Sequence, residues 1–227
     1  MTERRNGAQR FGMVLFGCLA AACMAVCAVY CLGGFDLHDR RVVSELEDDF
    51  GSRYTGLLVD GVKDGYGEIV YKNGDCYSGD FIDGLYGGRG IFVASAGWEY
   101  RGGFKDGLPE GNGVFTDENG GVFSGDFEAG RISGKGAFGV GPPDDWRYEG
   151  MWDQGRQSGE GSFAYADGSV YTGGFKDGAA SGAGLYTDAK GWSYEGGFLQ
   201  GLFEGGGTLT FKNGETIAGE WVSGQLQ

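Results

Sequence analysis

The chain has 227 residues, a formal net charge of −14, 50 glycines and 15 % aromatic residues. The negative charge argues against nucleic-acid binding, because phosphate backbones repel such a chain. The glycines follow no strict Gly-X-Y period, which excludes collagen, and the aromatic content excludes a disordered glycine-rich tract. Because His38 is the only histidine, most histidine-based metal sites and catalytic triads are also excluded.

The N-terminal part combines a basic tail, residues 1–10, with an uncharged run, residues 11–32. As a helix, this run would span roughly 33 Å, which is enough to cross the hydrocarbon core of a bilayer. We therefore predict a transmembrane helix over 11–32. A cleaved signal sequence is the alternative, because the "AAAC" stretch that ends at Cys23 resembles a lipoprotein cleavage site.

Positive charges near the run bear on its orientation. Arg4, Arg5 and Arg10 precede it, and Arg40 and Arg41 follow it. The larger number before the run favours a cytoplasmic N-terminus. We therefore expect a single-pass membrane protein whose remaining chain lies on the opposite side of the membrane.

Residues 33–53 differ in composition and form an acidic linker. Val42, Val43, Leu46 and Phe50 recur at helical spacing, and Gly51 is a typical stop residue. The pattern predicts a short amphipathic helix, which serves as a linker or covers the first edge of the following domain.

A repeat of 23 residues, with one step of 25, fills residues 54–227. Each unit begins with an aromatic residue or, in the last, isoleucine, and carries glycine at the second position after the start and a large apolar residue at the fourth. The unit starts are Tyr54, Tyr77, Tyr100, Phe123, Tyr148, Tyr171, Tyr194 and Ile217. Such a period must be interpreted before any local motif, and it gives seven full units and a partial eighth.

Each unit is predicted to form a hairpin of two antiparallel strands. The aromatic-x-Gly-x-aromatic pattern has a period of two, so both rings and the glycine share one sheet face. Asp-Gly, Gln-Gly and Asn-Gly pairs supply the turns. An isolated hairpin is marginally stable, so the units must stack edge to edge. The prediction is an all-β, elongated, single-layer antiparallel meander. In the fourth unit, the insertion in "GVGPPDDW" should lengthen one hairpin loop.

The rings that recur in the first strands form the core of this thin sheet and are also the candidate interaction surface. These residues are Tyr54, Tyr77, Phe81, Tyr100, Phe104, Phe123, Phe127, Tyr148, Trp152, Tyr171, Phe175, Tyr194, Phe198 and Trp221. A strip of acidic residues that includes Glu110 and Glu204 suggests either a calcium site or a solvated face, and we expect the solvated face.

The spacing "YxGxxxxGxxxGxGxxxxxxG", as in Tyr54 to Gly74, resembles the MORN repeat, the membrane occupation and recognition nexus motif. The resemblance implies a scaffold and no catalytic residues. We therefore expect a non-enzymatic, membrane-anchored scaffold without cofactor or metal, which binds a protein partner or a second copy of itself.

Two other functions stand as alternatives. The first is a lipid-recognition module that bridges or tethers membranes through lipid headgroups, although the net charge of −13 over 54–227 disfavours anionic headgroups. The second is a glycan-acting enzyme with paired carboxylates, although no pair stands out in the sequence.

Overall fold

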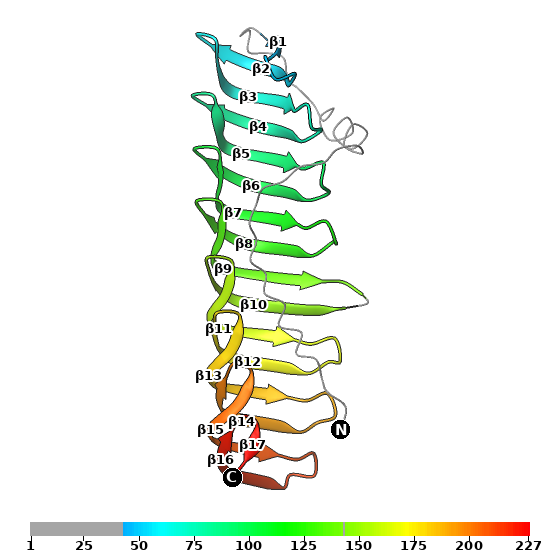
Figure 1. Ribbon diagram of the computed structural model, residues 1–227, viewed down its shortest axis with the longest axis vertical. Coiled ribbons are helices and arrows are strands. Elements are labelled where there is room, and N and C mark those ends of the chain that lie inside the picture. Colours follow the sequence, from blue (N-terminus) through cyan, green and yellow to red (C-terminus); the bar gives the residue numbers. More distant parts are fainter. Residues whose placement is uncertain (1–42, 143) are drawn as a thin grey trace. The chain divides into compact units, whose positions relative to one another are not determined.

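The computed structural model describes residues 43–142 and 144–227 (Figure 1). The predicted basic tail and the predicted transmembrane helix over residues 11–32 lie outside the described residues. Within the described ranges, no helix is both long and apolar enough to span a bilayer.

The described residues form one antiparallel sheet of 17 strands without an α-helix, and strands that are neighbours in sequence are hydrogen-bonded. The strands are β1 (Val43–Glu47), β2 (Arg53–Val59), β3 (Val62–Val70), β4 (Cys76–Ile82), β5 (Leu85–Val93), β6 (Glu99–Lys105), β7 (Leu108–Thr116), β8 (Val122–Glu128), β9 (Arg131–Val140), β10 (Trp146–Asp153), β11 (Arg156–Ala164), β12 (Val170–Lys176), β13 (Ala179–Thr187), β14 (Ser193–Leu199), β15 (Leu202–Thr210), β16 (Thr216–Val222) and β17 (Gln225–Leu226). The predicted single-layer meander is confirmed. The elongation expected of the whole array stays a prediction.

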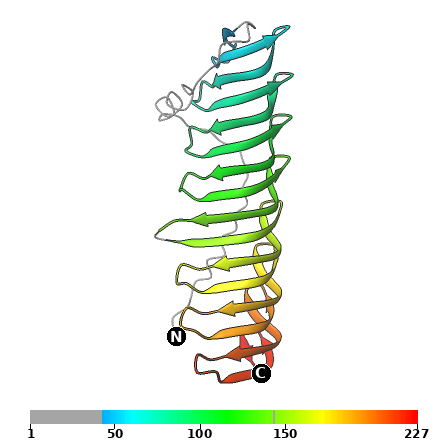
Figure 2. The ribbon, with the colours of Figure 1, turned by 180° about the vertical axis from the view of Figure 1, so that it is seen from behind.

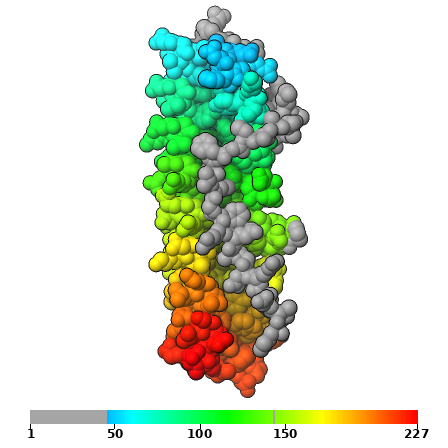
Figure 3. All heavy atoms as spheres, in the orientation of Figure 1, coloured from blue at the N-terminus to red at the C-terminus, as the bar shows by residue number. Residues whose placement is uncertain are grey.

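The described chain divides into two compact units, residues 43–131 and residues 132–227. In each unit the strands run side by side, with the shorter turns along one edge and the longer loops along the other (Figures 1 and 2). The space-filling view shows the successive hairpins of each unit as coloured bands (Figure 3).

The segment predicted as an amphipathic helix is a strand, so that prediction is wrong. All five residues of β1 pair with β2, from Val43 opposite Leu57 to Glu47 opposite Arg53. The free edge of β2 offers backbone donors and acceptors that a separate helix would leave unpaired. The segment therefore covers the first edge of the sheet, as the sequence suggested, but does so by adding a strand.

Two kinds of turn connect the strands of the first unit. Between β2 and β3, Asp60 and Gly61 both have positive φ, 51° and 82°, as a two-residue type I′ turn requires. Between β3 and β4 the loop has five residues, and Gly74 has a φ of 91°. Gly74 donates to the carbonyl of Tyr71 at 2.9 Å, which closes a type I turn followed by a glycine bulge. The aspartate and glycine residues therefore fix where the chain reverses.

Six of the hairpins that close in a two-residue turn, β2–β3, β4–β5, β6–β7, β10–β11, β12–β13 and β14–β15, also contain a bulge. In β2 and β3 the register shifts between Gly56 and Leu58, so that three residues of β3 lie opposite Leu57. Gly65, in the middle of those three, has a φ of 86°. A bulge bends the strand pair and increases its twist, so the two ends of the hairpin turn toward one face. Similar shifts recur in the second unit, for example between Gly196 and Phe198.

The two-residue loop insertion predicted between β9 and β10 is instead absorbed by the strands. The loop Gly141–Asp145 has five residues, as does the loop between β11 and β12. The two additional residues extend the ladder by the pair Val140 and Trp146. The prediction of a longer loop is therefore wrong, because the extra residues make backbone hydrogen bonds as part of the sheet.

Candidate interaction surface

The 14 residues proposed from the sequence line one face of the sheet and are buried. Their exposed fractions range from 0 % for Tyr148 to 9 % for Trp152. They are Tyr54, Tyr77, Phe81, Tyr100, Phe104, Phe123 and Phe127 in the first unit and Tyr148, Trp152, Tyr171, Phe175, Tyr194, Phe198 and Trp221 in the second. In the structure these rings form the hydrophobic core of each unit.

Contacts between rings link each repeat to the next. In the first unit, Tyr77 meets Phe81 of its own strand at 5.2 Å and Phe104 of the following repeat at 5.1 Å, both edge to face. In the second unit, Tyr194 meets Phe198 at 5.3 Å and Trp221 at 5.3 Å in the same manner. Edge-to-face pairs contribute about 0.5–1.5 kcal/mol each beyond area burial. The contacts therefore make neighbouring hairpins cooperative.

The tyrosine rings lie directly over glycine backbone. A Cβ atom on Gly67 would come within 2.6 Å of the Tyr54 ring, and one on Gly56 would come within 2.6 Å of the Gly67 Cα atom. The paired glycines leave the space that each ring fills. The glycine pattern therefore serves packing.

Each core tyrosine also donates a hydrogen bond. Tyr100 Oη donates to the carbonyl of Gly103 at 2.9 Å, and Tyr148 Oη donates to that of Met151 at 2.8 Å. Burial raises the pKa of Tyr100 and of Tyr148 to about 12, and nearby glutamates, Glu110 and Glu160 respectively, add to the shift. The hydroxyls are thus neutral donors that hold the bend of each hairpin.

A second set of aromatic residues, absent from the sequence prediction, lies where the five-residue loops close. In the second unit these residues are Trp146, Tyr165, Trp192 and Phe211. Tyr165 is 42 % exposed and Phe211 is 39 % exposed, whereas both tryptophans are half-buried. They therefore offer ring surface to a partner, unlike the core rings.

These four residues fall into two pairs along the sheet. Trp146 begins β10 and Tyr165 directly follows the neighbouring β11; we call them the first aromatic pair. Trp192 directly precedes β14 and Phe211 directly follows the neighbouring β15; we call them the second aromatic pair. β14 lies four strand spacings from β10. At about 4.8 Å per strand, the pairs lie roughly 19 Å apart.

Half-buried rings support the first pair. Trp146 stacks on Phe163 at 5.3 Å with an angle of 13° between the ring planes, and Phe163 meets Tyr165 at 4.6 Å. Tyr165 also meets Tyr186 at 6.1 Å, and Tyr186 meets Trp192 at 5.2 Å. The rings are held in place by one another, so little ordering would be needed when a ligand binds.

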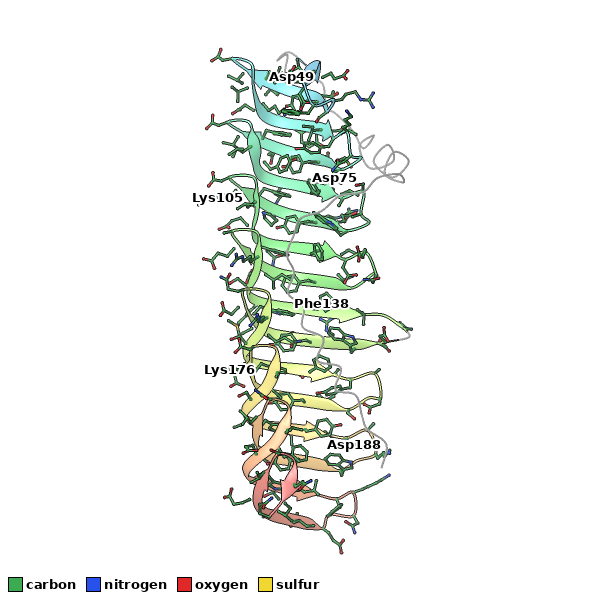
Figure 4. All side chains as sticks on the ribbon, in the orientation of Figure 1. Asp49, Asp75, Lys105, Phe138, Lys176 and Asp188 are labelled. Atoms are coloured by element: carbon green, nitrogen blue, oxygen red, sulfur yellow. The ribbon has the colours of Figure 1, made fainter. Side chains whose placement is uncertain are left out.

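Polar residues occupy the loop-closing positions between the two pairs. These are Ser169 and Asp188, which are both buried. Ser169 Oγ accepts a hydrogen bond from the Ala189 nitrogen of the next loop at 3.2 Å, and Asp188 Oδ1 accepts one from the Lys190 nitrogen at 2.8 Å. Figure 4 labels Asp188 at the loop edge of its unit and Lys176 at the opposite edge. These two residues hold the loops and are not available to a ligand.

The first unit uses the same kind of link with a different residue. Asp75 Oδ1 accepts hydrogen bonds from the backbone nitrogen and the hydroxyl of Ser95, both at 2.8 Å.

Glu110 and Glu204, from the acidic strip considered as a calcium site, each accept a hydrogen bond from a turn nitrogen. Ala129 donates to Glu110, and Ser223 donates to Glu204. Over residues 43–142 and 144–227, no group of three or more His, Cys, Asp or Glu side chains is placed to hold a metal ion.

Together, the fold and these surfaces define a tandem-repeat protein of antiparallel hairpins with a shared aromatic core. A family model described as the MORN repeat matches residues 54–76, 77–98, 100–122, 123–138, 148–170, 171–193 and 194–216. The matches cover more than half of the chain, and the chain belongs to the MORN repeat family. The seven predicted repeats are confirmed.

Other comparisons give weaker likenesses. No curated protein matches the chain. Among solved structures, the chain is similar to the SAS-4 (dCPAP) TCP domain of Drosophila melanogaster, solved in complex with a proline-rich motif of Ana2 (dSTIL), at 10 % identity and a TM-score of 0.43 over 79 % of this chain and 90 % of that one. It is also similar to the G-box domain of the microcephaly protein CPAP, at 14 % identity and a TM-score of 0.33 over 80 % of this chain and 100 % of that one. These values are too low to support an argument about function.

Proposed function

We propose that this MORN repeat protein is a non-enzymatic scaffold that presents its repeats to protein partners or to a second copy of itself. The observation that carries the proposal is the second set of aromatic residues. The core rings are buried within the sheet, whereas Tyr165 and Phe211 expose about two fifths of their surface at the loop edge. Exposed aromatic residues on a rigid support are typical of protein-binding surfaces.

The repeats themselves support a scaffold rather than an enzyme. The recurring tyrosine hydroxyls are used as hydrogen-bond donors to the backbone, and the recurring glycines make turns, bulges and room for rings. The features that recur in every repeat therefore have structural roles. The residues that close the loops differ between repeats, and these residues can determine which partner binds.

The proposal includes the membrane anchor in residues 11–32, with the N-terminus on the cytoplasmic side and the repeats on the other. The 22 uncharged residues and the arginines that precede them support this topology. Protease treatment of intact cells tests it: the repeats should be digested without permeabilisation. Protection until the membrane is opened would place them on the cytoplasmic side and would overturn the topology.

Crosslinking in membranes tests the scaffold. We compare the full chain with a variant that lacks residues 54–227 but keeps the anchor. The full chain should yield partner or self crosslinks that the shortened variant does not form. Recovery of the same partners by both would show that the repeats are not the binding element. Flotation with neutral and anionic liposomes then separates lipid recognition from protein binding.

A further inference from the structure

The two aromatic pairs of residues 132–227 differ in the charge around them. The loops beside the first pair, residues 141–145 and 165–169, contain Asp144, Asp145 and Asp167, all exposed, and no lysine or arginine. The loops that carry the second pair, residues 188–192 and 211–215, contain Lys190 and Lys212 as well as Asp188 and Glu215. The first pair is therefore acidic, whereas the second is balanced.

Stacked rings beside carboxylates are suited to a guanidinium group. A cation within about 6 Å of a ring centroid is attracted by the ring face, and arginine also stacks on aromatic planes. The same contact exists inside the first unit, where Lys63 Nζ lies 5.2 Å from the centroid of Tyr54 and 5.9 Å from that of Phe81. The second pair, with balanced charge and the exposed ring of Phe211, is suited to an uncharged apolar side chain.

The separation of the pairs selects the spacing in the partner. A chain of six extended residues spans about 19–20 Å, since each residue advances about 3.1–3.3 Å. This length equals the roughly 19 Å between the pairs that follows from four strand spacings. In both β and polyproline II conformations, residues six apart point to the same side, because six is a multiple of two and of three.

We propose that the loop edge of residues 132–227 binds an extended segment of a partner protein, with an arginine over the first aromatic pair and a large apolar residue six positions away over the second. The inference rests on the proposed scaffold function and adds the chemistry of the partner. The segment crosses the loop edge from β10 to β15. Ser169 and Asp188 lie beneath its middle and hold the loops.

Synthetic peptides test the proposal against the full chain in nonionic detergent at low salt. The first probe is a labelled 13-residue peptide of serine and proline with one arginine and, six positions later, one leucine. The second has the same composition with the leucine three positions from the arginine. The third replaces the arginine with glutamate. By fluorescence anisotropy, the first probe should bind about tenfold more tightly than either of the others.

Variants of the protein locate the site. Trp146→Ala should weaken binding of the first probe about tenfold. Trp192→Ala should make the first probe bind no more tightly than the three-position probe. Leu185→Ala is the matched control, because Leu185 is 43 % exposed on β13 but points to the opposite face from Tyr186. It should not change binding. Trp146→Phe keeps a ring and should retain most of the affinity, which separates loss of the site from loss of folding.

Three results would overturn the proposal. The first is equal binding of the six-position and three-position probes. The second is a Trp146→Ala variant that melts like the wild type and binds the first probe as tightly as the wild type does. The third is a change of oligomeric state, seen by analytical ultracentrifugation in Trp192→Ala, without any peptide binding; this would make the edge an interface between copies. If the probes fail while crosslinking still depends on residues 54–227, the scaffold function stands and only this inference fails.

Discussion

Three consecutive glycines in β15, Gly205, Gly206 and Gly207, are expected to respond differently to alanine. Gly205 has a φ of 71°, and a Cβ atom there would meet no atom within 4 Å. The Cβ atom on Gly206 would have only Glu220 Oε1 near it, at 3.7 Å. A Cβ atom on Gly207 would collide with the Tyr194 ring, whose Cε2 atom would lie at 2.6 Å. The three positions therefore separate backbone strain, open space and ring contact.

The magnitudes follow from these environments. Gly206→Ala should stabilise the protein by about 0.5–1 kcal/mol, because alanine loses less conformational entropy in a strand. Gly205→Ala should cost about 1–2 kcal/mol, because an L-residue is strained at this φ. Gly207→Ala should cost about 2–4 kcal/mol: about 1–3 for overpacking and about 1 for the hydrogen bond from Tyr194 to Gly197.

The Tyr194 ring has little freedom to move away from the alanine. It stacks on Phe203 at 3.8 Å and meets Phe198 and Trp221 at 5.3 Å each. Urea denaturation of the three variants, followed by circular dichroism, gives the free energies. In a Tyr194→Leu background, the cost of Gly207→Ala should fall below about 1 kcal/mol, because the colliding ring is gone. Equal costs for Gly206→Ala and Gly207→Ala would refute the reasoning.

Three further predictions concern hydrogen bonds and pH. Tyr148→Phe removes the donor to the Met151 carbonyl and should cost about 1–2 kcal/mol in urea denaturation, with an unchanged free energy contradicting the role of the hydroxyl. Burial raises the pKa of Tyr148 to about 12 from its ordinary value of 10.0, so its contribution to stability is fully present below pH 10.0 and is lost as the pH rises toward 12. The urea midpoint should therefore fall over this range, and less steeply in Tyr148→Phe. Asp75→Ala should speed amide exchange at Ser95, whereas Asp75→Asn, which keeps an acceptor, should restore most of the protection. Exchange in Asp75→Ala as slow as in the wild type would show that the link to Ser95 is not needed.

The repeat, its hairpins and its core could be predicted because each is encoded locally. Alternation of ring and glycine fixes the buried face, and the Asp-Gly pairs fix the reversals. The segment from Val43 to Glu47 could not be assigned in this way. Its apolar residues have helical spacing, but the unpaired edge of β2 decides its structure, and that edge lies outside the segment itself.

The aromatic pairs could not be predicted from the sequence for a related reason. Aligned by repeat, Trp146 and Trp192 fall two positions before the start of a repeat, whereas Tyr165 and Phe211 fall 17 positions after the start of one. Neither position is regularly aromatic, so no column of the repeat stands out. Only the pairing of strands shows that both positions close the same kind of loop. An alignment that joins positions opposite each other across the hairpin would have revealed them.

The most direct test of the central claim, that residues 54–227 are the binding element of a scaffold, is crosslinking in native membranes with and without those residues. Quantitative mass spectrometry of the crosslinked products is the measurement. We expect partner or self crosslinks that map to the repeats in the full chain and disappear in the variant reduced to the N-terminal 53 residues. Equal recovery of the same partners by the two proteins would contradict the claim.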